Sequence, residues 1–123
     1  MTLDPVLAPL ATSRVVALAR SGFYSGIRIH RTAPGFVVQF GDPVGDGSSG
    51  AGKTPLPCET SPVEFSAFSV GVALSGRDTG SSQIFVTLSP QLHLDGDYTA
   101  LGKADPEWAN VAEGDVIRSV EVR

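Results

Sequence analysis

Apolar positions recur along this chain with two different periods, and each period predicts a kind of element. Ala11, Val15 and Leu18 lie four and three residues apart, which places them on one face of a helix that ends near Ala19. Residues 27–31 then alternate between apolar and polar, as the two faces of a half-buried strand do. The first third of the chain therefore predicts a helix followed by a strand.

Five further short stretches have the composition of strands. They are rich in Val, Ile, Phe or Thr, and they comprise residues 36–40, 65–74, 83–88, 99–101 and 116–122. Asp105-Pro106-Glu107 has the pattern of a helix start, and Trp108 and Val111 would share one face of a short helix that Gly114 ends. The 14 glycines and 9 prolines spread between these stretches favour tight turns. The whole pattern predicts a mainly β fold with one helix near each end.

Composition and charge narrow the class of protein. The 123 residues suit one domain with a single core, and the hydrophobic fraction of 41% favours folding over disorder. The net charge of −4 argues against nucleic acid or an anionic membrane as partner, because phosphates are bound by clustered Lys and Arg. Cys58 is the single cysteine, which excludes an internal disulfide. With no apolar run of membrane-spanning length and no signal-peptide pattern, we expect a cytoplasmic protein.

One stretch matches a nucleotide-binding motif in its letters alone. Residues 47–54 fit G-x-x-x-x-G-K-[ST], the pattern whose lysine and backbone amides hold phosphates. The motif requires a helix directly after the Lys-Thr pair, whereas Pro55 and Pro57 follow here, and proline disfavours helix at and before its position. We interpret the stretch as a loop with a solvated lysine, and nucleotide binding remains a rival function.

Four blocks of sequence carry a resemblance to a known family. The most informative block, residues 29–43, reads Ile-His-Arg-Thr-Ala-Pro-Gly-Phe-Val-Val-Gln-Phe-Gly-Asp-Pro. The others are Ala-Arg-Ser-Gly-Phe-Tyr-Ser-Gly at 19–26, Ser-Ser-Gln-Ile-Phe-Val-Thr at 81–87, and His-Leu-Asp-Gly-Asp-Tyr-Thr-Ala-Leu-Gly-Lys at 93–103. In this order the blocks resemble the cyclophilin family of peptidyl-prolyl cis-trans isomerases.

The resemblance implies a fold, and the chain departs from it in two places. The family fold is a closed, eight-stranded antiparallel β-barrel capped by two α-helices, expected here as a single domain over residues 1–123. Residues 1–3 can supply only the end of the family's first strand. We therefore expect that strand to be absent or borrowed from another copy, which would leave an open barrel edge available for self-association. Phe40, Ser49 and Ser81 stand where the family has glycine, and we expect their larger side chains to reshape the groove.

The implied chemistry needs no nucleophile, metal or cofactor, because the enzyme has only to favour the twisted Xaa-Pro bond over the planar one. In the twisted bond the nitrogen lone pair can accept a hydrogen bond, and a guanidinium is a fixed cation with several donors. The resemblance assigns this donor to Arg31, the proline pocket to Phe36, and the anchoring of the substrate carbonyl to Gln39. It assigns further substrate contacts to Val37, Ala73, Leu74, Gln83, Phe85, His93, Leu94 and Tyr98.

The same residues have plainer interpretations. Without the four blocks, Arg31 would be interpreted as half of a surface ion pair, and Phe36 and Phe85 as core residues. The two histidines and Cys58 lack metal-ligand spacing, and no serine lies in a nucleophile elbow. We predict an isomerase of Xaa-Pro bonds in peptides and in unfolded or partly folded proteins, with cyclosporin-like molecules as further ligands. The alternative is a cyclophilin-like module that binds proline-containing segments with weak or no catalysis.

Overall fold

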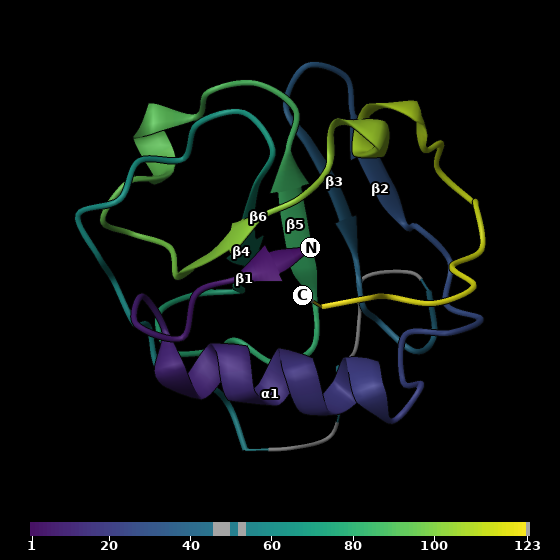
Figure 1. The fold of residues 1–123 in the computed structure, drawn as a ribbon, viewed down its shortest axis with the longest axis horizontal. Helices are drawn as coiled ribbons and strands as arrows, with labels where there is room; N and C mark the ends of the chain where they lie inside the picture. The colour runs from purple at the N-terminus through teal and green to yellow at the C-terminus, as the bar shows by residue number, and fades with distance from the viewer. Residues whose placement is uncertain (46–49, 52–53, 123) are drawn as a thin grey trace.

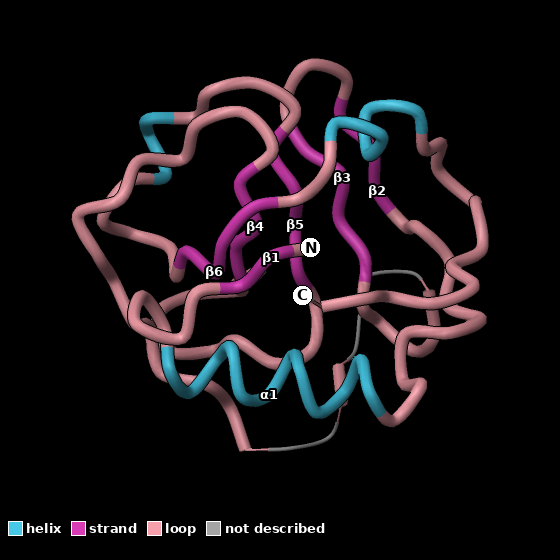
Figure 2. The backbone as a smooth tube through the Cα atoms, in the orientation of Figure 1, coloured by secondary structure: helices cyan, strands magenta, loops and turns pink. Residues whose placement is uncertain are grey.

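Six short strands, one α-helix and two 3-10 turns make up the fold in a computed structural model, which describes residues 1–45, 50–51 and 54–122. In chain order they are β1 Thr2–Leu3, α1 Pro9–Arg20, β2 Arg31–Ala33, β3 Val37–Phe40, β4 Ser69–Val72, β5 Ile84–Thr87, η1 Leu92–Leu94, β6 Ala100–Lys103 and η2 Pro106–Asn110. The strands form one antiparallel sheet in the order β1-β6-β4-β5-β3-β2. They gather in the middle of the molecule, with loops around them (Figure 2). The prediction of a mainly β fold is confirmed.

The predicted helix is α1, which lies across one end of the sheet (Figure 1). Its buried face contains Ala11, Val15 and Leu18, as their spacing predicted. The residue before the helix, Ala8, offers no side-chain cap. Instead the carboxylate of Glu59 accepts hydrogen bonds from the backbone N–H groups of residues 10 and 11, at 3.0 and 2.7 Å. An acidic residue distant in the sequence therefore accepts hydrogen bonds from the otherwise unpaired N–H groups of the first turn. Its negative charge also interacts favourably with the positive end of the helix dipole.

The first strand is shortened rather than lost. Residues 1–3 do supply only a short piece, as expected, but that piece pairs with β6 of the same chain through Thr2 opposite Lys103 and Leu3 opposite Gly102. This pairing corrects the expectation that the strand is absent or borrowed from another copy. Met1 and Leu3 are both buried in the main core, which explains why so short a strand is held in place.

The C-terminal segment runs close to both edges of the sheet, next to β1 at one edge and next to the residues before β2 at the other. Gly26 N and Ile29 N donate hydrogen bonds to the carbonyls of Ile117 and Asp115, at 2.7 and 2.8 Å, and the amino group of Met1 donates to the carbonyl of Glu121 at 2.9 Å. The two termini therefore lie side by side (Figure 1). The prediction of a strand at 116–122 is wrong, because this segment forms an isolated bridge, between Arg28 and Val116, and no ladder. The residues that it contacts, 26–29, lie before β2 and belong to none of the described strands.

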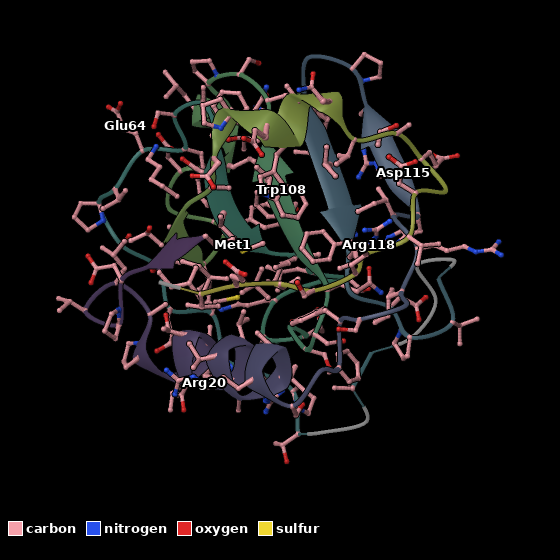
Figure 3. All side chains as sticks on the ribbon, turned by 45° about the vertical axis from the view of Figure 1, so that its right-hand side comes forward. Met1, Arg20, Glu64, Trp108, Asp115 and Arg118 are labelled. Carbon is pink, nitrogen blue, oxygen red and sulfur yellow. The ribbon has the colours of Figure 1, made fainter. Side chains whose placement is uncertain are left out.

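The second predicted helix is only the 3-10 turn η2, which corrects the expectation of two α-helical caps. After five residues the chain turns away, because Ala112 N donates to the Asp115 carboxylate and Gly114 N donates to the carbonyl of Ile29. Trp108 nevertheless packs inward from η2, on the side that faces the sheet (Figure 3). The turn thus contributes one aromatic side chain to the core in place of a helical face.

Phe40 lies in the core and not in the groove. Its ring is fully buried, stacked on Trp108 at 5.1 Å and edge-on to Tyr24 at 5.8 Å between ring centroids. The expectation that Phe40 reshapes the groove is therefore wrong, because side chains alternate along β3 and Phe40 shares its face with Val38. The hydroxyl of Ser81 accepts a hydrogen bond from Ala51 N at 3.2 Å.

The stretch that matched the nucleotide-binding motif lies largely outside the described residues, as does Ser49. Of this stretch the structure describes residues 50, 51 and 54. These residues and the following 55–57 are not helical, and Leu56 forms a bridge with Gly80. The helix that a phosphate-binding loop requires does not begin there. Within the described ranges, none of the helical segments is both long and apolar enough to traverse a bilayer.

Candidate active site

Arg31 and Gln39 face each other across the hairpin of β2 and β3. The Arg31 Nη1 donates to Gln39 Oε1 at 3.3 Å, and Gln39 Nε2 donates to Gln83 Oε1 at 3.1 Å. Arg31 is exposed, and within the described part of the chain its guanidinium belongs to no ion pair. The plainer interpretation of Arg31 as half of a surface ion pair is thus unsupported. The side chain is a cation held at the groove by the neutral amide of Gln39, which is itself bonded to Gln83.

A tight turn fixes the position of Phe36. Phe36 N donates to the carbonyl of Ala33 at 2.9 Å, and Gly35 between them has φ +69°. Pro34 followed by a glycine with positive φ is the sequence of a type II turn. The turn brings the Phe36 ring to 5.6 Å from the Arg31 Cζ, measured to the ring centroid, within the range of a cation–π contact.

A pocket of about 160 Å³ opens beside these residues. Its lining consists of Arg31, Phe36, Val37, Gln39, Ala73, Leu74, Phe85, Leu94 and Tyr98. Three of these side chains, Val37, Phe85 and Leu94, are buried and belong to an apolar cluster separate from the main core. Alternation along β3 explains the separation, since Val37 and Gln39 point to this side of the sheet while Val38 and Phe40 point to the other.

The floor of the pocket depends on Phe65 and Gly71, two residues that the sequence patterns did not single out. The Phe65 ring lies under Phe85 with 5.6 Å between centroids, and Tyr98 meets Phe85 edge-on at 5.8 Å. Gly71 lies opposite Phe85 in the β4–β5 pairing, and a Cβ atom on Gly71 would collide with the Phe85 Cζ and come within 2.9 Å of the Phe65 ring. A glycine inside an apolar strand often marks such a close approach, and this signal could have found the site.

Nine of the eleven predicted site residues line this pocket. The other two lie at its border. Gln83 reaches the pocket through its hydrogen bond from Gln39, and the exposed His93 ring is 5.8 Å from the Phe36 ring. The structure therefore brings together all the residues assigned by resemblance, from four separate segments of the chain.

A buried tyrosine supports the segment before β5 that carries Gln83. The Tyr24 hydroxyl donates to the carbonyl of Ser82 at 2.9 Å. Burial raises the pKa of Tyr24 above its ordinary value, and the positive charge of Arg14 lowers this pKa by a smaller amount. The phenol therefore keeps its proton and remains a donor to Ser82 at neutral pH.

The arrangement suits the binding of a small apolar ring next to a hydrogen-bond donor. Apolar side chains and polar groups share the pocket lining, and Arg31, the cation among the described lining residues, lies where Phe36 and Gln39 contact it. A guanidinium has more donors than Gln39 can occupy, so it can still donate to a ligand. The described residues that line the pocket include no serine, cysteine or histidine, and the described part of the chain holds no group of three side chains that could bind a metal.

Known proteins resemble this chain in sequence and in fold. Residues 1–114 match the family model described as cyclophilin type peptidyl-prolyl cis-trans isomerase. The peptidyl-prolyl cis-trans isomerase B of Bacillus subtilis is 42% identical over 98% of this chain and 87% of its own length. A peptidyl-prolyl cis-trans isomerase of Helicobacter pylori is 40% identical over 92% of this chain and 73% of its own length.

A solved structure agrees with these matches. A cyclophilin type peptidyl-prolyl cis-trans isomerase of Cryptosporidium parvum superimposes with a TM-score of 0.81 and 30% identity, covering 88% of this chain and 72% of that one. The structure of the same enzyme in the presence of the dipeptide Ala-Pro gives a TM-score of 0.80.

Proposed function

Because this chain belongs to the cyclophilin family of peptidyl-prolyl cis-trans isomerases, we propose that it isomerises Xaa-Pro bonds in the groove of Arg31, Phe36 and Gln39. One observation carries the proposal: a guanidinium that has no carboxylate partner among the described residues is held by Gln39 at the edge of a pocket with apolar side chains. In an Xaa-Pro bond an apolar ring is joined to the amide nitrogen, and this nitrogen becomes a hydrogen-bond acceptor as the amide twists. An apolar surface beside a fixed donor suits such a substrate.

The pocket binds the proline ring. Phe36, Phe85 and Leu94 supply apolar surface, and a proline ring removed from water gains the usual stabilisation of about 25 cal/mol per Å² of buried apolar area. Once the ring is held, the residue before proline can rotate about the Xaa-Pro bond while the ring stays in place. Binding of the ring thus fixes one side of the bond and leaves the other free to turn.

Arg31 favours the twisted bond. The planar amide delocalises its nitrogen lone pair and offers no acceptor there, whereas the twisted amide does, so a donor near this nitrogen stabilises the transition state more than the ground state. A hydrogen bond from a charged group contributes about 1.5–3 kcal/mol, which corresponds to roughly 10- to 150-fold in rate. Gln39 keeps the guanidinium in place and can anchor the substrate carbonyl, and the contact between Gln39 and Gln83 restricts the Gln39 amide in turn.

The experiment is an NMR exchange measurement on an Ala-Pro peptide with the wild-type chain and Arg31→Ala. We expect faster cis-trans exchange with the wild type and a loss of roughly 10- to 150-fold in kcat/KM in the variant, as worked out above for one charge-assisted hydrogen bond. Arg118→Ala, an exposed arginine on the C-terminal segment, is the matched control and should keep full activity. Peptide line broadening without faster exchange in the wild type would contradict catalysis and support the alternative of a binding module.

Several finer properties follow from the same proposal. The partners would be proline-containing peptides and unfolded or partly folded chains, so the protein would assist protein folding, in the cytoplasm. Cyclosporin-like cyclic peptides would compete for the groove, which a titration against the Ala-Pro peptide measures. Self-association through the β1 edge stays a prediction, and sedimentation tests it; the Met1–Glu121 hydrogen bond already occupies part of that edge.

A further inference from the structure

The turn that carries Phe36 is held by two polar side chains from the segment that follows the neighbouring strand β5. The Ser89 hydroxyl donates to the carbonyl of Gly35 at 2.5 Å. The Gln91 Nε2 donates to the same carbonyl at 3.3 Å and to the Ser89 hydroxyl oxygen at 2.9 Å. We call this closed set of three hydrogen bonds the Gly35 clasp. We propose that Ser89 and Gln91 are positioning residues for the isomerisation, which set the place of Phe36 at the proline pocket.

The turn needs support from outside its own hairpin. β2 is the edge strand of the sheet and has three residues, so β3 alone holds it by a ladder. The Pro34-Gly35 turn protrudes beyond the last pair of that ladder, Ala33 and Val37. Leu88 N donates to the carbonyl of Phe36 at 2.8 Å, and the clasp adds its bonds to the carbonyl just before Phe36. The segment 88–91 therefore fixes the backbone on both sides of the Phe36 amide.

Gln91 also fixes the opposite wall of the pocket. Its backbone N donates to the carbonyl of Phe65 at 2.7 Å, and its own carbonyl accepts from Leu94 N at 3.0 Å. Phe65 supports the pocket floor, and Leu94 lines the pocket. One residue thus connects the Phe36 turn, the floor and the η1 wall. The separation of Phe36 from Leu94, which decides whether the pocket fits a proline ring, depends on the Gln91 conformation.

The effect should appear in the binding of the proline ring. Phe36 and Leu94 contact the ring in the ground state and in the transition state alike, so loosening them removes binding that both states share, which raises KM and leaves kcat nearly unchanged. Loss of one side-chain donor should lower kcat/KM about five-fold, which is about 1 kcal/mol. This inference rests on the proposed function, so the test includes a measurement of peptide affinity that does not depend on turnover.

The experiment compares Gln91→Met, which keeps the length and removes the donor, with Gln91→Lys, which restores a donor. Ser89→Ala is the second variant, and Ser13→Ala, an exposed serine on α1, is its matched control. The readouts are kcat and KM from NMR exchange, the affinity for an Ala-Pro peptide from chemical shifts, and the thermal midpoint. We expect Gln91→Met and Ser89→Ala to raise KM and lower affinity about five-fold, Gln91→Lys to recover most of the loss, and Ser13→Ala to match the wild type.

Two results would overturn the proposal. The first is an unchanged KM and peptide affinity in Gln91→Met. The second is a fall in kcat alone that follows a lower thermal midpoint, because this would reflect a smaller folded fraction and hence a merely structural role. A wild-type chain that binds the peptide without accelerating exchange would instead refute the proposed function, and the affinities of the variants would still test the clasp.

Discussion

A methyl group added at Gly71 should damage the pocket from below. Gly71 is buried in β4 directly opposite Phe85, and the ideal Cβ position collides with the Phe85 Cζ and lies 2.9 Å from both the Phe85 Cε1 and the Phe65 Cε1. Heavy atoms do not approach a Cβ this closely, so Gly71→Ala must displace at least one ring. Phe65 is held below by its backbone bonds to Asp95 and Gln91, whereas Phe85 borders an open cavity. We therefore expect Phe85 to move into the proline pocket.

The size of the effect follows from the geometry. Overpacking of a closed core costs about 1–3 kcal/mol, and the open pocket lets Phe85 relax, so we expect about 1 kcal/mol of lost stability. For a chain of this length this corresponds to a thermal midpoint lower by about 3–6 °C. Activity should suffer more, because the displaced ring fills part of a pocket of only about 160 Å³. A loss of about 1.5–3 kcal/mol in proline burial, comparable to one apolar side chain, predicts a kcat/KM reduced roughly 10- to 150-fold.

The assay combines thermal unfolding with NMR exchange on an Ala-Pro peptide. A second variant, Gly71→Ala with Phe65→Leu, removes ring atoms that the methyl group meets and should restore part of the activity. Phe65→Leu alone is the control for the loss of the lower ring. The reasoning fails if Gly71→Ala keeps the wild-type kcat/KM, or if activity and stability fall together and the second substitution restores neither.

Two predictions concern the parts that support the groove. Glu59→Ala removes the carboxylate that caps α1 and should lower the unfolding free energy by about 1–2 kcal/mol in a urea titration; the exposed Glu64→Ala is its control, and an equal effect in both would contradict the capping role. Burial raises the pKa of Tyr24 in the folded state, so the unfolded chain releases its proton first. The free energy of unfolding should therefore fall as pH rises above about 10, the pKa of tyrosine in the unfolded chain, by at most about 1.4 kcal/mol per pH unit. The Tyr24→Phe chain should not show the part of this decrease that comes from Tyr24. Parallel pH profiles for the two chains would refute the assignment.

Local patterns predicted those elements whose form is decided locally. The spacing of Ala11, Val15 and Leu18 gave α1, because an amphipathic face depends only on the helical period. Strand composition predicted β3, and the alternation of side chains along a strand places Phe40 on the face opposite Gln39, although the comparison with family glycines had suggested a groove position. The pocket residues were predictable because the four blocks that resemble the family contain most of them.

Features that depend on distant partners were not predictable from the chain. The cap of α1 comes from Glu59, 48 residues after Ala11, and no local pattern connects an acidic loop residue with a helix start. Phe65 was expected within a long strand, but it lies before β4, where the carboxylate of Asp95 accepts its N–H at 2.7 Å. The β-branched residues 116–122 have strand propensity, yet a ladder also needs a regular neighbour, which residues 26–29 do not provide.

The order of strands in the sheet has a consequence for when the groove can exist. Its walls come from the β2–β3 hairpin, from β4 and β5, and from residues 94–98, and the hairpin turn is held by hydrogen bonds that span up to 56 residues, from Gly35 to Gln91. A fold with so many non-local pairings has a high contact order and should fold in milliseconds to seconds rather than microseconds. During synthesis the Arg31 hairpin leaves the ribosome several seconds before Tyr98 does. A nascent chain should therefore bind no proline ring until residues 94–98 have emerged and β6 has paired with β4.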